Sequence, residues 1–157
     1  MSMLNTLLEI DFSKLIIIVE GPDCAGKTTV CNLLHLITDF PVKHLTQNDP
    51  AILDTYMNIL KESDIILDRF YFSEFVYSTV VRCGNTTLHA EDVMKIKERM
   101  SELTCLIIHV TNTKEVLVAR ARDRGEDYVN EEQLCRIKDT YELLFSSVKH
   151  IRLELNL

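Results

Sequence analysis

The sequence predicts an α/β fold in which a five-stranded parallel sheet is covered by helices. Five short apolar runs recur, at residues 15–19, 42–45, 65–67, 106–110 and 151–155, and most are rich in β-branched side chains. The segments between them have helical character, and this alternation is typical of βαβ units around a buried parallel sheet. A length of 157 residues, of which 46% are hydrophobic, suits a single domain that spans residues 1–157.

Two of the intervening segments show the apolar periodicity of amphipathic helices. In residues 29–37 one stripe is formed by Val30, Leu33, Leu34 and Ile37. In residues 131–148 a longer stripe is formed by Leu134, Ile137, Tyr141, Leu144, Phe145 and Val148. We expect both stripes to pack on the sheet.

Charge and cysteine content narrow the classes of partner. A net charge of −7 offers no general basic surface to nucleic acid or to an anionic membrane. The five cysteines include no CxxC pair, which is typical of reduced thiols in a reducing compartment. Residues 1–12 lack the basic start of a secretory signal, and no apolar run approaches the ~18 residues of a membrane span. We therefore expect a cytoplasmic protein without a membrane partner.

The segment GPDCAGKT, from Gly21 to Thr28, matches the phosphate-binding pattern G-x-x-x-x-G-K-[ST] at every fixed position. It follows the first predicted strand and opens the first predicted helix, so its backbone N–H groups and the helix N-terminus would surround phosphate oxygens. Lys27 is predicted to reach the β- and γ-phosphates of ATP, and the Thr28 hydroxyl to bind Mg²⁺. The motif indicates a P-loop NTPase fold with three layers. The expected ATP-binding residues are Gly21, Asp23, Cys24, Ala25, Gly26, Lys27, Thr28 and Thr29.

A second candidate group follows the third apolar run, where the carboxyl end of a parallel strand faces the ligand. Asp68 is predicted to hold magnesium or to position the attacking oxygen, and Arg69 to bridge the donor and acceptor phosphates during transfer. The alternative is a helix cap with a surface ion pair. Phe72, Ser73 and Tyr77 are predicted to bind the acceptor, and Ser73, Glu74 and Tyr77 fall at helical spacing with Arg69. Phe72 and Tyr77 suit a core position equally well.

Three arginines crowd together near the end of the predicted helix at residues 114–124. Arg122 and Arg124 are predicted catalytic residues of a lid, at about residues 120–130, that closes over the triphosphate. Arg120 is predicted to stack near the adenine. The alternative is a solvated helix end for which Gly125 provides the stop.

Together these elements resemble the thymidylate kinase and deoxynucleoside kinase superfamily of P-loop kinases. Residues 19–29, VEGPDCAGKTT, look like the opening of a thymidylate kinase. Residues 68–73, DRFYFS, look like the family's Asp-Arg-aromatic-x-x-Ser signature. Residues 120–125, RARDRG, are similar to the family's lid. The resemblance implies a nucleotide or nucleoside kinase with Tyr77 near the deoxyribose. Many short phage-encoded relatives have the same appearance, so the resemblance is compatible with a viral source.

Two departures from the family concern the acceptor. The stretch between Lys27 and Asp68 is shorter than in family members, which usually place base-recognising helices there. The family's Arg-Glu-Pro segment after the second strand is replaced by TQNDP at residues 46–50. Asp49 is assigned as a partial replacement for the acidic residue of that segment, as a base or a magnesium partner.

The leading interpretation is ATP-dependent phosphoryl transfer to a deoxynucleotide such as dTMP. One alternative is a deoxynucleoside kinase in which Asp68 or Asp49 accepts the proton of a 5′-hydroxyl. Another is a kinase that acts on a hydroxyl of a DNA end or a modified base, against which the net negative charge counts. A GTPase-like switch is disfavoured because no Asn-Lys-x-Asp segment follows a strand. Dimerisation is common among the relatives, so a homodimer remains an open expectation.

Overall fold

The computed structural model describes residues 14–46, 49–125 and 128–156. Their strands form one parallel sheet in the order β2-β3-β1-β4-β5. The strands are β1 (Leu15–Glu20), β2 (Val42–His44), β3 (Ile65–Asp68), β4 (Thr104–Thr111) and β5 (Ile151–Glu154). The helices are α2 (Lys27–Thr38), α3 (Leu53–Ile59), α4 (Tyr71–Val80), α5 (Ala90–Ser101), α6 (Lys114–Arg124) and α7 (Glu131–Phe145). The predicted α/β class with a five-stranded parallel sheet is confirmed.

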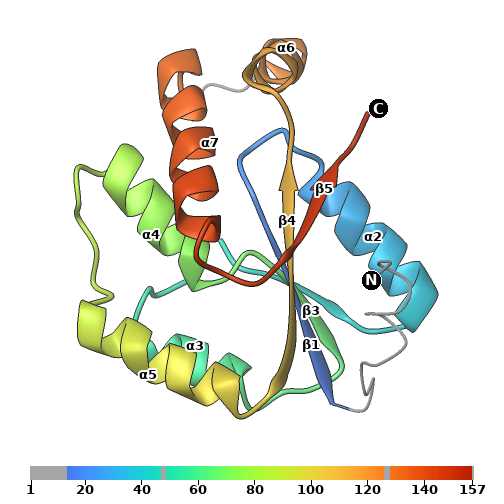
Figure 1. The fold of residues 1–157 in the computed structure, drawn as a ribbon, viewed down its shortest axis with the longest axis vertical. Coiled ribbons are helices and arrows are strands. Elements are labelled where there is room, and N and C mark those ends of the chain that lie inside the picture. The colour runs from blue at the N-terminus through green and yellow to red at the C-terminus, as the bar shows by residue number, and fades with distance from the viewer. Residues whose placement is uncertain (1–13, 47–48, 126–127, 157) are drawn as a thin grey trace.

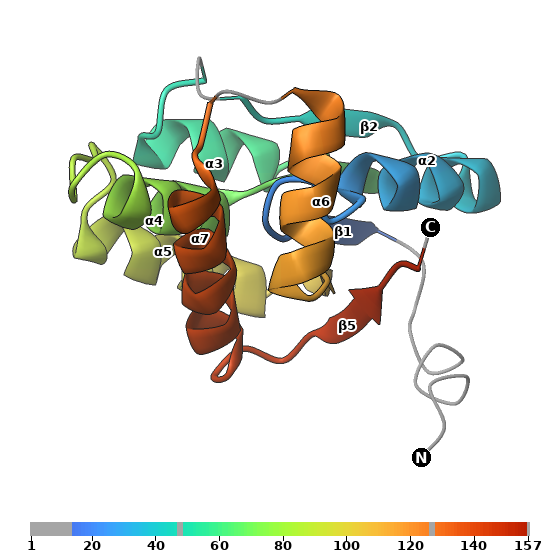
Figure 2. The ribbon, with the colours of Figure 1, turned by 90° about the horizontal axis from the view of Figure 1, so that it is seen from above.

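The helices divide unequally between the two faces of the sheet. Figure 1 shows α2 on one side and α3, α4, α5 and α7 on the other. This division follows from the strand order, because the chain crosses from β1 to β2 in the direction opposite to its later crossings. Since such crossings are right-handed in nearly all proteins, opposite directions place their helices on opposite faces. Seen from above, α6 lies between α7 and α2 (Figure 2).

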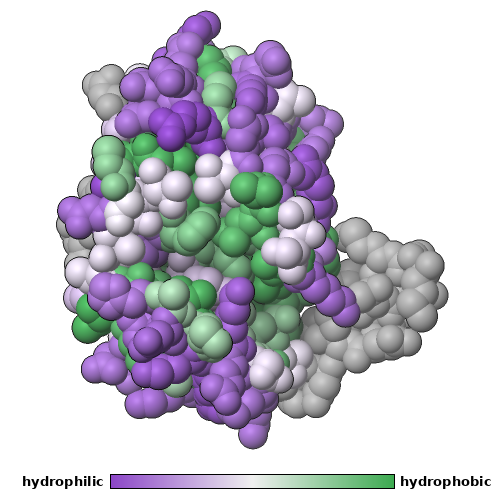
Figure 3. All heavy atoms as spheres, turned by 60° about the vertical axis from the view of Figure 1, so that its left-hand side comes forward, coloured by the Kyte–Doolittle hydropathy of each residue, from purple (hydrophilic) through white to green (hydrophobic). Residues whose placement is uncertain are grey.

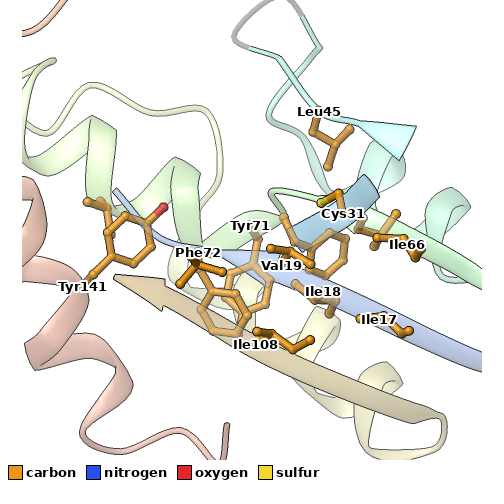
Figure 4. Close-up of a cluster of buried hydrophobic side chains, with 14 of the residues drawn as sticks. Ile17, Ile18, Val19, Cys31, Leu45, Ile66, Tyr71, Phe72, Ile108 and Tyr141 are labelled. Carbon is orange, nitrogen blue, oxygen red and sulfur yellow. The ribbon is translucent and has the colours of Figure 1, made fainter. Parts of the chain in front are cut away.

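The central strand β1 is buried along its whole length, which explains its unbroken apolar run. Figure 4 shows how its side chains meet those of both helical layers, with Cys31 from α2 on one hand and Phe72 from α4 on the other. The strands at the two edges differ from β1. Each residue of β2 is exposed, and β5 alternates between half-buried and exposed positions, because each edge strand has only one neighbour.

The predicted apolar stripe of the first helix is confirmed for Val30 and Leu34 and was wrong for Leu33 and Ile37. The core-facing positions of α2 are Lys27, Val30 and Cys31, with Leu34 partly buried one turn later. Leu33 and Ile37, which were expected to pack on the sheet, are 52% and 80% exposed. The reason is that Lys27 points into the loop at residues 21–28, called the phosphate loop after its predicted role. This fixes which positions three, four and seven residues later face the sheet.

The predicted stripe of the last helix is confirmed for four residues of α7, which are buried: Leu134, Ile137, Tyr141 and Phe145. The helix ends at Phe145, so Val148 packs against the core from the following turn. Figure 3 shows that hydrophobic and neutral residues gather in the middle of the face on this side, between hydrophilic regions. The exposed large apolar side chains of these helices include Phe75 of α4 and Leu143 of α7.

Among the described residues, no helix is long and apolar enough to cross a membrane. The expectation that residues 1–12 are not a secretory signal concerns residues outside the described ranges.

Candidate active site

The loop that begins at Gly21 turns sharply between β1 and α2. A Cβ atom on Gly21, at φ +149°, would lie 1.9 Å from the backbone oxygen of Val110 in β4, so a larger residue cannot occupy the position without displacing the loop. Cys24 and Gly26 also have positive φ angles, of 63° and 101°. The loop therefore folds back over the N-terminus of the 12-residue helix α2, where phosphate groups bind in proteins.

A cavity of about 190 Å³ lies against this loop and is called the phosphate cavity, after the predicted role of the loop. Its lining residues come from the loop, the start of α2, the ends of β2 and β3 and the end of α6, and they are Asp23, Cys24, Gly26, Lys27, Thr28, Thr29, His44, Asp68, Arg69 and Arg124. The structure thus brings together predicted residues from three distant segments of the chain. The predicted residues Gly21 and Ala25 are buried within the loop and shape it from behind.

Lys27 is buried at the start of α2, and its Nζ donates a hydrogen bond to the backbone oxygen of Pro22 at 2.7 Å. Burial lowers the pKa of Lys27 to about 8, and the charge of Arg69 acts in the same direction. The carboxylates of Asp23 and Asp68 oppose this shift. The ammonium group is therefore held inside the loop at a position where a phosphate oxygen can replace the carbonyl as its partner.

Asp23 connects the loop to the segment that follows β3. Its Oδ1 accepts a hydrogen bond from Arg69 Nη2 at 2.5 Å, and its Oδ2 accepts one from the Tyr77 hydroxyl at 2.6 Å. The Arg69 guanidinium also lies 5.0 Å from the centre of the Tyr77 ring, a cation–π distance. Burial alone would raise the pKa of Asp23, but the charges of Lys27 and Arg69 lower it below the ordinary value.

Asp68 and His44 form a pair at the carboxyl ends of two neighbouring strands. The two residues are register partners in β3 and β2, so their side chains lie side by side. His44 Nδ1 lies 2.8 Å from Asp68 Oδ2. The other carboxylate oxygen, Asp68 Oδ1, is buried without a hydrogen-bond partner among the described residues. About half of the His44 side chain is exposed, whereas the Asp68 side chain is 6% exposed.

A second, larger cavity of about 470 Å³ adjoins the first. Asp23, His44 and Arg69 line both cavities, so these residues stand between them. Farther inside, Glu74 Oε2 accepts a hydrogen bond from Arg82 at 2.7 Å, and its Oε1 accepts one from the Thr86 hydroxyl at 2.7 Å. The two cavities therefore adjoin at Asp23, His44 and Arg69, and the loop that begins at Gly21 borders the smaller one.

The predicted acceptor residues lie at different depths. Tyr77 and Asp49 line the larger cavity, and Asp49 Oδ2 accepts hydrogen bonds from the backbone N–H and the hydroxyl of Thr46. Phe72 is 1% exposed and packs between Tyr71 and Phe145, so the structure places it in the core and not in the cavity. Of the two interpretations that the sequence allowed for Phe72, the core position is the one observed.

Ser73 borders the larger cavity, but its hydrogen-bonding groups are directed to Glu20. The Glu20 carboxylate is fully buried and accepts hydrogen bonds from the backbone N–H groups of Phe70 and Ser73, the Ser73 hydroxyl and the Tyr141 hydroxyl. Burial raises the pKa of Glu20, and these donors offset part of that shift. The network fixes the start of α4, so Ser73 positions the helix that bears Tyr77.

The three arginines of α6 separate into different environments. Arg124 lines the phosphate cavity. Arg120, which was expected near an adenine, donates hydrogen bonds to the backbone oxygens of Cys24 and Leu155 at 3.1 and 2.7 Å. Arg122 is exposed and forms two hydrogen bonds with Glu131, at 2.5 and 2.8 Å, away from the cavity lining. Residues 126–127 of the predicted lid lie outside the described residues.

Sequence reasoning missed His44, Glu20 and Arg82, the partner of Glu74. His44 is a polar residue at the last position of a strand, and the rule that ligands bind beyond the carboxyl ends of parallel strands would have marked it. Glu20 is likewise the last residue of β1. The partnership of Glu74 with Arg82 has no comparable signal, since the two residues are eight positions apart across the end of a helix.

The strand order, the phosphate loop and the parallel sheet define the class: the chain has the fold of P-loop kinases. No protein-family model matches the sequence.

The particular proteins that the chain resembles are kinases and a prophage protein. YorR, an SPbeta prophage-derived uncharacterized protein of Bacillus subtilis (strain 168), is 22% identical over 138 residues, which are 84% of this chain and 82% of YorR. The crystal structure of YorR in complex with phosphorylated GDP matches with a TM-score of 0.77 and covers 89% of this chain and 84% of YorR.

Two further solved structures share the fold. The deoxyadenosine kinase of M. mycoides with bound dATP has a TM-score of 0.62 at 15% identity, over 90% of this chain and 92% of that one. A gluconokinase from Sinorhizobium meliloti 1021 has a TM-score of 0.55 at 14% identity, over 90% of this chain and 82% of that one. At these identities the likeness establishes the fold, and the resemblance to thymidylate kinase stays a prediction.

Proposed function

We propose that this protein is an ATP-dependent kinase whose acceptor is a deoxynucleoside or a deoxynucleotide. The observation that supports the proposal most strongly is the joint between the two cavities, where Asp23, His44 and Arg69 line both. A phosphate loop occupies one side of this joint, and a space of about 470 Å³ suited to a small molecule lies on the other. A phosphoryl group in transfer would pass between these residues.

The donor side provides positive charge from several elements. Lys27 and the N-terminus of α2 face the phosphate cavity, with Arg69 and Arg124 on its rim. Groups that are already in place when negative charge moves from the γ-phosphate to the leaving oxygen stabilise the transition state without reorganisation. These residues are therefore proposed to bind the triphosphate of ATP and to stabilise its transfer.

The residues near the loop also suit Mg²⁺, which this class of reaction requires. Asp68 Oδ1 is a buried oxygen without a described partner, and Thr28 is exposed to the same cavity. No cluster of three or more His, Cys, Asp or Glu residues suited to a metal occurs in the described part of the chain. Such a cluster is not required for Mg²⁺, which usually binds to one or two protein groups together with phosphate oxygens and water. Bound there, the ion would share the phosphate charge.

The charges of the larger cavity favour a neutral acceptor over a phosphorylated one. Among its described lining residues are three acidic side chains, Asp23, Asp49 and Glu74, and two basic ones, Arg69 and Arg82. Each of the two guanidinium groups is already paired with a carboxylate. A dianionic phosphate would enter a site without surplus positive charge, which costs free energy. We therefore place a deoxynucleoside kinase ahead of a deoxynucleoside monophosphate kinase.

A monophosphate acceptor such as dTMP remains the second candidate, because one observation favours it. Arg69 lies between the two cavities, at a position from which its guanidinium would bridge a donor and an acceptor phosphate. The relatives are consistent with nucleotide chemistry, since deoxyadenosine kinase binds dATP and YorR was crystallised with phosphorylated GDP. Both guanine and adenine compounds therefore belong among the acceptors to be tested.

The decisive experiment is a screen for ATP consumption against deoxynucleosides, their monophosphates and short DNA, in the presence of Mg²⁺. We expect turnover with at least one free nucleoside or nucleotide and none with the Lys27→Met variant, which lacks the ammonium group of the loop. The control is the Lys149→Met variant, which removes a lysine that lines neither cavity. A protein that folds, yet neither binds Mg-ATP nor phosphorylates any of these acceptors, would falsify the proposal.

A further inference from the structure

His44 lies where it can take part in the proposed kinase reaction, and its role as inferred below rests on that proposed function. The imidazole lies at the joint of the two cavities, at the end of an edge strand, and about half of its surface is exposed. We propose that His44 accepts the proton of the acceptor hydroxyl during phosphoryl transfer and that Asp68 holds its ring in position. The acceptor of this enzyme is accordingly a nucleoside hydroxyl.

The carboxylates around the larger cavity are already committed as hydrogen-bond acceptors. Asp49 accepts from Thr46, Asp23 accepts from Arg69 and Tyr77, and Glu74 accepts from Arg82 and Thr86. These hydrogen bonds direct the carboxylates toward protein groups, so they are less available to the hydroxyl of an acceptor. The sequence had suggested Asp68 or Asp49 as the base, and each now has another role.

The Asp68 carboxylate determines which nitrogen of His44 is available. Asp68 Oδ2 has no proton to donate when it is ionised, so the 2.8 Å contact requires His44 Nδ1 to carry the hydrogen. The lone pair of the neutral ring then resides on Nε2. No hydrogen bond to Nε2 occurs among the described residues. This arrangement of a carboxylate, an imidazole and an open nitrogen is the usual way to orient a histidine base.

The proposed step is balanced in atoms and electrons. The hydroxyl oxygen of the nucleoside forms a bond to the γ-phosphorus of ATP, and its proton moves to His44 Nε2. The bond between the γ-phosphorus and the β,γ-bridging oxygen breaks, and its electron pair leaves on ADP. The imidazolium is stabilised by Asp68 and returns its proton to water through its exposed face.

The need for a base distinguishes the two candidate acceptors. A hydroxyl is not ionised at neutral pH and gains from a base in the transition state, whereas the phosphate oxygen of a monophosphate is already ionised. A histidine positioned by a buried carboxylate therefore has a role as a base only with the first kind of acceptor. The balance of charge in the larger cavity points to the same conclusion.

The test compares His44→Ala and His44→Gln with a matched variant, His35→Ala, in the full-length protein. His35 hydrogen-bonds the Phe40 backbone oxygen and lines neither cavity. We expect both His44 variants to lose about 100-fold or more in kcat with a nucleoside, while the Kd for Mg-ATP changes less than about twofold. His35→Ala should keep its kcat. Added imidazole should restore part of the activity of His44→Ala, because the vacated site opens to solvent.

The outcomes separate this inference from the proposed function. If no acceptor is phosphorylated by the wild-type protein, the kinase proposal fails first. If nucleosides are phosphorylated but both His44 variants keep kcat within about threefold, His44 is not the base and the kinase proposal stands. The same holds if only monophosphates are phosphorylated and His44→Ala raises KM for them at an unchanged kcat.

Discussion

Lys27 is the residue whose protonation depends most directly on whether the phosphate loop is filled. Without a ligand, burial lowers its pKa to about 8, and its partner is a backbone carbonyl. A triphosphate replaces that neutral partner with several negative oxygens, which raises the pKa again. Binding of Mg-ATP at pH 8 should therefore take up about half a proton, since half of the Lys27 side chains are neutral at a pH equal to their pKa.

This proton uptake is measurable by titration calorimetry of Mg-ATP binding in buffers with different ionisation enthalpies. The observed heat should depend on the buffer at pH 8 and lose most of that dependence at pH 6, where the lysine is already charged. In the Lys27→Arg variant the group is charged at both pH values, so the dependence at pH 8 should disappear. Equal buffer dependence in the two proteins would assign the proton to another group.

At the level of single residues, the sequence predicted positions better than roles. The phosphate loop, Asp68 and Arg69 form the cavity that their patterns indicated. Ser73 and Phe72 were correctly placed on the helix after Arg69, but helical spacing alone cannot show that one side chain serves Glu20 and the other the core. Those contacts join residues more than 50 positions apart.

At the level of elements, α4 depends on a carboxylate that belongs to β1. The Glu20 side chain accepts two N–H groups at the start of α4 and two hydroxyls, one of them from α7. Replacing Glu20 with alanine removes the acceptor of both buried N–H groups, whereas the Ser73 and Tyr141 hydroxyls keep only each other. We expect a loss of about 3 kcal/mol or more in the free energy of unfolding, measured by urea denaturation.

Two matched variants distinguish the network from simple loss of volume. Glu20→Gln keeps the shape and one acceptor oxygen, so it should cost clearly less than Glu20→Ala. Ser73→Ala removes one neutral partner and should cost about 1 kcal/mol. Equal stabilities of Glu20→Ala and Ser73→Ala would mean that the carboxylate does not organise the helix.

The end of α6 makes a separate prediction about its arginines. Arg124 lines the phosphate cavity, whereas Arg122 pairs with Glu131 outside it. We expect Arg124→Ala to lower kcat/KM for ATP by about 100-fold, the usual effect of losing one electrostatic donor. Arg122→Ala should change it by less than about threefold. Steady-state kinetics decide between them, and the reverse order of effects would show that Arg122 reaches the phosphates during the reaction.

Elements with a strong local pattern were the most predictable part of the fold. The five strands and α7 agree with their apolar periodicity. The rotation of α2 was not predictable, because Leu33, Leu36 and Ile37 make an apolar stripe that is as regular as the buried one. The orientation is decided by the phosphate loop, which directs Lys27 inward, and not by hydrophobicity.

At the level of the whole molecule, the sheet order determines which residues meet. His44 and Asp68 become partners only because β2 lies beside β3, and β3 lies beside β1 with its phosphate loop. A parallel α/β pattern is compatible with several strand orders, so no spacing rule could have paired these residues. The class of fold was therefore predictable, whereas the pair that we propose for proton transfer was visible only in three dimensions.

Asp23 has a consequence for how the two substrates bind. Asp23 belongs to the phosphate loop, yet it accepts hydrogen bonds from Arg69 and Tyr77, which line the larger cavity proposed for the acceptor. Binding of ATP at the loop therefore changes the surroundings of the acceptor, and binding of the acceptor changes those of ATP. We expect heterotropic cooperativity: a non-hydrolysable ATP analogue should tighten the acceptor about fivefold or more, and the acceptor should tighten the analogue by the same factor. In Asp23→Ala the Kd of each substrate should become independent of the other substrate, and binding isotherms of the analogue measured with and without the acceptor would show the loss of coupling.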